Sequence, residues 1–133
     1  MNGSVAYLDT SAVVKLLMRE PETANLRRQL RRWPRRVSSA LLTVELLRTV
    51  KRAGLPHLLS DARHLIGTLH LIRLDDELLD RAAWLDPPNL RSLDAIHLAT
   101  ALSLGTDLGA MVTYDRRMAA GVEALGLPLV APT

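Results

Sequence analysis

Apolar and polar positions follow two different periods along this chain, and the change between them predicts alternating strands and helices. Five short apolar runs are typical of buried strands: SVAYLD (4–9), RVSS (36–39), LIRL (71–74), AMVTYD (110–115) and PLVAP (128–132). Longer segments between them have the apolar spacing of helices that bury one face. These segments cover residues 10–18, 22–33, 40–54, 55–70, 75–85, 92–105 and 116–126.

The boundaries of these helices carry ordinary capping signals. Thr10 or Ser11 is expected to cap the first helix. Ser92 is expected to cap the helix over residues 92–105. Pro34 is expected to end the second helix, and Gly54 to close the third. No repeat or long linker interrupts the order, so we predict a single domain over residues 1–133.

This order of strands and helices predicts a three-layer α/β/α sandwich with a central parallel sheet. In such open sheets the functional site lies at the carboxyl ends of the strands. Asp9 and Asp115 each fall at the end of a predicted strand. The sequence therefore directs attention to acidic chemistry at one edge of the sheet.

Composition narrows the class of protein. The 133 residues include no cysteine, which excludes disulfides, thiolate metal sites and cysteine nucleophiles. The N-terminus lacks the basic and apolar regions of a signal peptide. No apolar run approaches the roughly 20 residues of a membrane span. We therefore expect a cytoplasmic protein with no membrane partner.

Charge adds one feature whose role the sequence leaves open. Fifteen of the 17 basic residues are arginine, and six of these lie in residues 26–36. Such a run binds phosphates or an acidic partner, or else forms a solvated helix face. The four aromatic residues, two Trp and two Tyr, are too few for a base-stacking platform.

Four acids stand out, and each also has a structural explanation. Asp9 and Asp115 could cap the helices that they precede. Glu45, inside the apolar run LLTVELL, could pair with Arg48 or Arg52 on the same side of its helix. Asp94 could be a first-turn acid favoured by the helix dipole.

Convergence of the four acids would change this interpretation. Like charges at short range cannot all remain ionised without a cation among them. With oxygen ligands and no thiolates, a hard divalent ion such as Mg²⁺ fits best. Such an ion can activate water and neutralise the charge of a phosphodiester.

Four segments in order, YLDTSAVVKLL, TVELLR, LDAIHLATAL and MVTYD, resemble the motifs of PIN-domain ribonucleases. The match spans residues 5–131, and the residues of the first and third motifs are most similar to those of VapC-type toxins of bacterial toxin–antitoxin systems. The resemblance implies a PIN-like fold and a Mg²⁺-dependent endoribonuclease in which Mn²⁺ substitutes. It also implies a homodimer and a cognate VapB-like antitoxin that covers the acidic groove.

The resemblance also assigns residues. The metal-binding and catalytic acids fall on Asp9, Glu45, Asp94 and Asp115. Of these, Asp9 and Asp94 are expected to hold the principal ion, and Asp115 is the position that acts through water. The hydroxyls that support the carboxylates fall on Ser11 and Thr113.

Other features leave alternatives open. His97, three residues after Asp94, is predicted to be a buried, hydrogen-bonded structural residue. Arg116 and Arg117 either contact substrate phosphates or are surface charges. A receiver-type signalling domain is disfavoured, because the first strand ends in a single acid and the last lysine is Lys51. The remaining rival is a non-catalytic PIN-like module that binds RNA or protein.

Overall fold

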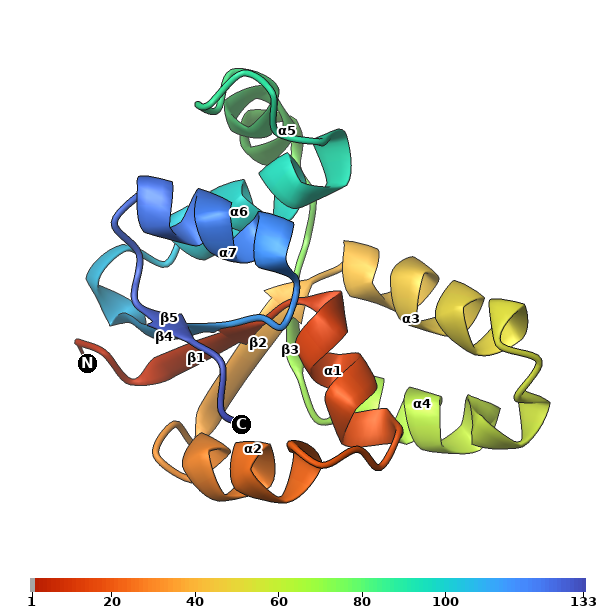
Figure 1. Ribbon diagram of the computed structural model, residues 1–133. Helices are drawn as coiled ribbons and strands as arrows, with labels where there is room; N and C mark the ends of the chain where they lie inside the picture. Colours follow the sequence, from red (N-terminus) through yellow and green to blue (C-terminus); the bar gives the residue numbers. More distant parts are fainter. Residues whose placement is uncertain (1) are drawn as a thin grey trace.

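A five-stranded parallel sheet forms the centre of the computed structural model, which describes residues 2–133 (Figure 1). The strands are β1 (Val5–Leu8), β2 (Arg35–Ser39), β3 (His70–Ile72), β4 (Leu108–Val112) and β5 (Leu129–Val130). Their order across the sheet is β3-β2-β1-β4-β5, and every neighbouring pair is parallel. The predicted parallel sheet is therefore confirmed.

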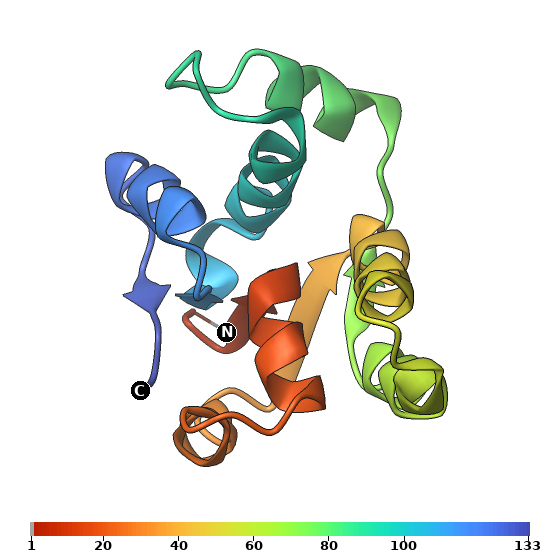
Figure 2. The same cartoon turned by 45° about the vertical axis from the view of Figure 1, so that its right-hand side comes forward.

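Helices cover both faces of this sheet. They are α1 (Thr10–Leu17), α2 (Thr23–Leu30), α3 (Leu41–Arg52), α4 (Leu59–Gly67), α5 (Asp76–Ala83), α6 (Ser92–Leu102) and α7 (Arg116–Ala124). Figures 1 and 2 show α1 to α4 on one side of the sheet and α6 and α7 on the other, with α5 stacked on α6. The fold is the predicted three-layer α/β/α sandwich.

Alternation along β1 explains why both faces need a cover. Ala6 and Leu8 point into the apolar core under α1, α2, α3 and α4. Val5 and Tyr7 point into the core on the opposite face, under α6 and α7. Successive side chains of a strand point to opposite faces, so a strand that is apolar throughout is stable only between two helical layers.

The chain reverses its direction of travel across the sheet beside β1. It moves outward from β1 to β2 and β3, then returns to place β4 on the other side of β1. Strands β1 and β4 pair along their length, and just past their carboxyl ends the Asp9 amide donates to the Val112 carbonyl at 3.2 Å. Such a switch point is where open α/β sheets form their sites.

Several predicted boundaries need correction. The strand expected over 110–115 is β4, which begins two residues earlier, at Leu108, and ends three residues earlier, at Val112, while Asp115 caps α7. The α2 helix ends at Leu30, and not at Trp33, because the amides of residues 31–33 bond to carbonyls three residues back instead of four.

Two capping predictions also differ from the structure. Asp9 caps α1 in place of Thr10 or Ser11, and Arg91 occupies the cap position of α6 in place of Ser92. The closing role of Gly54 is confirmed, since it follows α3 with a φ of 68° that favours glycine. None of the helices described between residues 2 and 133 is long and apolar enough to cross a bilayer.

Candidate active site

Asp9 lies at the switch point, between the end of β1 and the start of α1. Its Oδ1 accepts hydrogen bonds from the Ala12 amide at 3.0 Å and from the Ser11 hydroxyl at 2.7 Å. Its Oδ2 accepts from the Thr113 hydroxyl at 2.5 Å. The side chain is only 3% exposed, and this burial raises the pKa of Asp9, although the bonds from Thr113 and Ser11 oppose the rise.

The hydroxyls of Ser11 and Thr113 also accept hydrogen bonds from the turn that follows β4. Ser11 Oγ accepts from the Tyr114 amide at 2.8 Å, and Thr113 Oγ1 accepts from the Asp115 amide at 3.1 Å. The turn after β4 is thereby fixed against the first turn of α1. The structure places both hydroxyls on Asp9, as the resemblance implies, and their support of a metal ligand stays a prediction.

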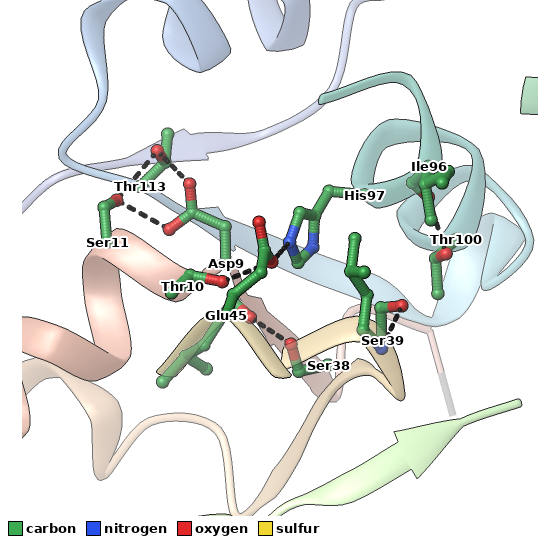
Figure 3. A network of polar contacts seen from close by, with 12 residues as sticks. Asp9, Thr10, Ser11, Ser38, Ser39, Glu45, Ile96, His97, Thr100 and Thr113 are labelled. Atoms are coloured by element: carbon green, nitrogen blue, oxygen red, sulfur yellow. Dashed lines mark hydrogen bonds and ion pairs between the residues drawn. The ribbon is translucent and has the colours of Figure 1, made fainter. Parts of the chain in front are cut away.

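Glu45 reaches the same edge of the sheet from α3. Its Oε1 accepts from the Thr10 hydroxyl at 2.6 Å and contacts His97 Nε2 at 2.7 Å. In Figure 3 the Glu45 carboxylate lies between Thr10 and the His97 ring, beside Asp9. Within residues 2–133 no ion pair joins Glu45 to Arg48 or Arg52, so that structural alternative is wrong.

The His97 ring is held at both nitrogens. Its Nδ1 lies 2.6 Å from the Tyr7 hydroxyl, while its Nε2 contacts Glu45. Burial raises the pKa of Tyr7, so its hydroxyl keeps its proton and can donate to Nδ1. Nε2 carries a hydrogen toward Glu45, because an ionised carboxylate oxygen can only accept a hydrogen bond.

This contact sets the charge state of Glu45. Burial alone would raise the pKa of Glu45, but the hydrogen bonds from His97 and Thr10, with the charge of His97, outweigh it and lower the pKa. Glu45 is therefore an ionised carboxylate at neutral pH. Its Oε1 is occupied by two donors, so Oε2 is the atom left for a ligand.

Asp94 and Asp115 form the other half of the acidic edge. Burial and the negative charge of Asp115 raise the pKa of Asp94, and His97, Arg117 and Arg91 oppose this rise. Asp115 is exposed and caps α7, since its Oδ1 accepts from the amides of Arg117 at 2.8 Å and Met118 at 3.3 Å. The capping role that the sequence suggested for Asp115 is thus present.

The four acids lie along this edge as two pairs, Asp9 beside Glu45 and Asp94 near Asp115, and do not gather into one cluster. Across residues 2–133, no three carboxylate or imidazole side chains lie close enough together to surround an ion. Mg²⁺ needs no such cluster, because it keeps several waters and binds through one or two carboxylates. A buried aspartate with a raised pKa and an ionised glutamate with a free oxygen fit a hard cation of this kind.

His97, Thr10 and Tyr7 are the residues whose part in this site the sequence did not reveal. His97 is 2% exposed and hydrogen-bonded, as predicted, but its partner is a candidate catalytic acid. The one sign of this role in the sequence was the position of His97 three residues after Asp94, which puts both residues on the same side of α6. Contacts with Glu45 and Tyr7, 52 and 90 residues away in sequence, depend on the tertiary fold.

Comparison with known proteins assigns the chain to a family. The model of the PIN domain matches residues 6–122. Ribonuclease VapC46 of Mycobacterium tuberculosis is 48% identical over 127 residues, which cover 96% of this chain and 97% of that protein. Ribonuclease VapC47 of the same species is 41% identical, over 95% of this chain and 96% of its own length.

Solved structures agree with the fold. A toxin–antitoxin complex from Klebsiella pneumoniae contains a chain that superposes with a TM-score of 0.73 at 22% identity, over 96% of this chain and 98% of that one. The four acids, the switch-point site and the sequence relatives lead to one conclusion. This chain belongs to the PIN-domain family, alongside the VapC ribonucleases.

Proposed function

We propose that this protein is a metal-dependent endoribonuclease that acts as the toxin of a type II toxin–antitoxin pair. The carrying observation is Asp9, a buried carboxylate at the switch point that collects three hydrogen bonds and stands beside the ionised Glu45. Relatives at 41–48% identity carry the name ribonuclease, which supports RNA as the substrate.

The proposed reaction assigns a part to each acid. Asp9 and Asp94 would hold Mg²⁺, for which Mn²⁺ would substitute, and Glu45 and Asp115 would complete the acidic edge. When bound, the ion would activate water and neutralise charge on the scissile phosphate. Glu45 Oε2 would accept the proton of the attacking water, since His97 and Thr10 hold the carboxylate through Oε1.

Three hydroxyls and one imidazole fix these carboxylates in advance. Ser11 and Thr113 hold both oxygens of Asp9, and Thr10 with His97 holds Glu45. Supporting contacts of this kind orient ligands and commonly change metal affinity or activity by about 10–100-fold when removed. The acidic edge is therefore preorganised on the side of Asp9 and Glu45.

Partners follow from the same assignment. The Klebsiella structure is described as a complex of a toxin with its antitoxin. We propose a VapB-like antitoxin that covers the acidic edge of this protein, and a homodimer as its working form.

The alternative function is a PIN-like module that binds RNA or protein without cutting. A cleavage assay separates the two, with total RNA incubated with the wild type, with Asp9→Asn, and with EDTA as a further arm. We expect cleavage by the wild type in Mg²⁺ or Mn²⁺ and none in the other arms. Asn at position 9 can still accept the Ala12 amide, so the variant should fold. Binding without cleavage by the wild type in Mg²⁺ would establish the alternative.

A further inference from the structure

A hollow of about 340 Å³ adjoins the acidic edge and has no part in the proposed reaction. It lies between the segment that leads into α6 and the side of α7 that carries Arg117, Ala120 and Gly121. Its lining includes Asn89, Leu90, Arg91, Arg117, Ala120 and Gly121. Its size is within the range of about 300–1,000 Å³ that is usual for pockets binding small molecules.

Two arginines join the hollow to the acids. Arg91 holds the cap position of α6, three residues before Asp94, and Arg117 is the second residue of α7. Both side chains line the hollow, and Asp94 lies in the first turn of α6, next to the cap position that Arg91 holds. Both side chains are exposed, and within residues 2–133 neither has a carboxylate within ion-pair distance.

The walls of the hollow have a different chemistry. Leu90 and Ala120 provide apolar surface, and Asn89 is exposed and offers an amide. Gly121 allows α7 to approach closely, since a Cβ there would lie 2.8 Å from Leu98 Cδ1 and 3.4 Å from Leu90 Cδ2. The missing side chain therefore leaves space for Leu98 and Leu90 to pack against α7.

We propose that this hollow is a nucleotide subsite for single-stranded RNA, with a phosphate between Arg91 and Arg117 and the base against Leu90. The proposal rests on the endoribonuclease function, because it places the nucleotide that flanks the cleaved bond. Guanidinium groups bind phosphate oxygens through two parallel hydrogen bonds. An unstacked base presents an apolar face and a hydrogen-bonding edge, which match the leucine and the Asn89 amide. An acidic peptide would use the arginines alone.

The test measures RNA binding separately from cleavage. In the Asp9→Asn background with Mg²⁺ present, a labelled single-stranded RNA of about ten nucleotides is titrated by fluorescence anisotropy at several salt concentrations. The site variant is Arg91→Gln/Arg117→Gln. The matched control is Arg52→Gln/Arg63→Gln, which removes the same charge from exposed positions on α3 and α4. Circular dichroism checks that each variant folds.

The site variant should weaken RNA binding about tenfold or more at low salt. Its plot of log affinity against log salt should be shallower by about 0.7 for each RNA phosphate that the variant no longer neutralises. The control should change affinity less than about twofold. Arg91→Lys/Arg117→Lys should fall between the two, because lysine keeps the charge but lacks the planar fork.

Other outcomes would overturn the subsite. Equal slopes for the site variant and its parent would do so, as would an equal effect of the control. Tighter Mn²⁺ binding with unchanged RNA affinity would show that the arginines only balance the acids. Loss of binding to a polyglutamate peptide, with RNA binding intact, would assign the hollow to an acidic protein. RNA binding that responds as expected, in a wild type that never cleaves, would leave the nucleotide site standing and remove the proposed reaction.

Discussion

The two halves of the acidic edge are built in different ways. Asp9 and Glu45 are buried or half-buried, and between them they accept hydrogen bonds from Ser11, Thr113, Ala12, Thr10 and His97. Burial and the negative charge of Asp115 instead raise the pKa of Asp94, and the charges of His97 and two arginines lower it. One half is held by hydrogen bonds before any ligand arrives, whereas the other is a charge imbalance that a cation would relieve.

The largest expected contrast between the halves is in stability. Asp9→Ala removes the cap of α1 and leaves the Ser11 and Thr113 hydroxyls without their acceptor. The free energy of unfolding should fall by about 2 kcal/mol or more. Asp94→Ala should change it by no more than about 0.5 kcal/mol. Urea unfolding of both variants without metal provides the measurement, and equal effects would remove the distinction between the two halves.

A second contrast concerns His97, which contacts Glu45 in one half and affects the pKa of Asp94 in the other. His97→Ala should lower the cleavage rate at saturating Mg²⁺ by about 10–100-fold, because Glu45 loses one of its two donors at Oε1. His97→Gln should recover part of the loss, since its amide can donate to the same oxygen. Single-turnover cleavage measures the rates, and thermal unfolding serves as the control for packing. A glutamine variant as slow as the alanine variant would show that the ring does more than orient Glu45.

Acidity should weaken metal binding through the raised pKa values of Asp9 and Asp94. As the pH falls through that raised range, each carboxyl takes up a proton and can no longer ligate. Mn²⁺ affinity should fall by up to about tenfold per pH unit for each proton taken up. Titrations of the wild type and Asp94→Asn should differ, with a shallower pH dependence in the variant. Identical profiles would place the pH dependence on Asp9 alone.

The metal-free protein should respond to pH in the opposite sense. A carboxyl with a raised pKa binds its proton more tightly in the folded state than in the unfolded chain. Its contribution to stability is present at low pH and is lost as the pH rises through the raised pKa. Asp94 should therefore favour the metal-free fold at mildly acidic pH, with other groups acting in parallel.

The smallest expected effect is that of Asp115→Asn. Asparagine is an equally good cap for α7, so the free energy of unfolding should stay within about 0.5 kcal/mol of the wild type. The pKa of Asp94 should fall, because its negative neighbour is gone. An NMR titration of the Asp94 carboxyl measures this directly. An unchanged pKa would mean that burial alone accounts for the rise.

The sequence predicted the layers of this fold because each strand is short and apolar, and because the segments between strands have the apolar spacing of helices. It also located Asp9 and Asp115 near strand ends, and linked Ser11 and Thr113 to them through the family motifs. It could not predict that His97 would join Glu45 to Tyr7. Buried histidines look alike in a sequence, and their partners are set by how α6 crosses the sheet.

Local rules failed where tertiary hydrogen bonds replaced local ones. Thr10 looked like a helix cap, but its hydroxyl donates to Glu45, and Asp9 caps α1 instead. Glu45 looked like the partner of an arginine one turn away, yet it turns toward a histidine from another helix. Sequence patterns describe one element at a time, whereas this site is assembled from the ends of several.

The hydrogen bond from Thr113 to Asp9 spans 104 positions of the chain. During synthesis from the N-terminus, Asp9 emerges from the ribosome long before the residue that fixes its second oxygen. A nascent or truncated chain that stops before β4 has half of the acidic edge without its brace. Under the proposed activity, such a chain would not cleave RNA, so the ribosome that makes this nuclease would face a competent one only after β4 and Thr113 have been made.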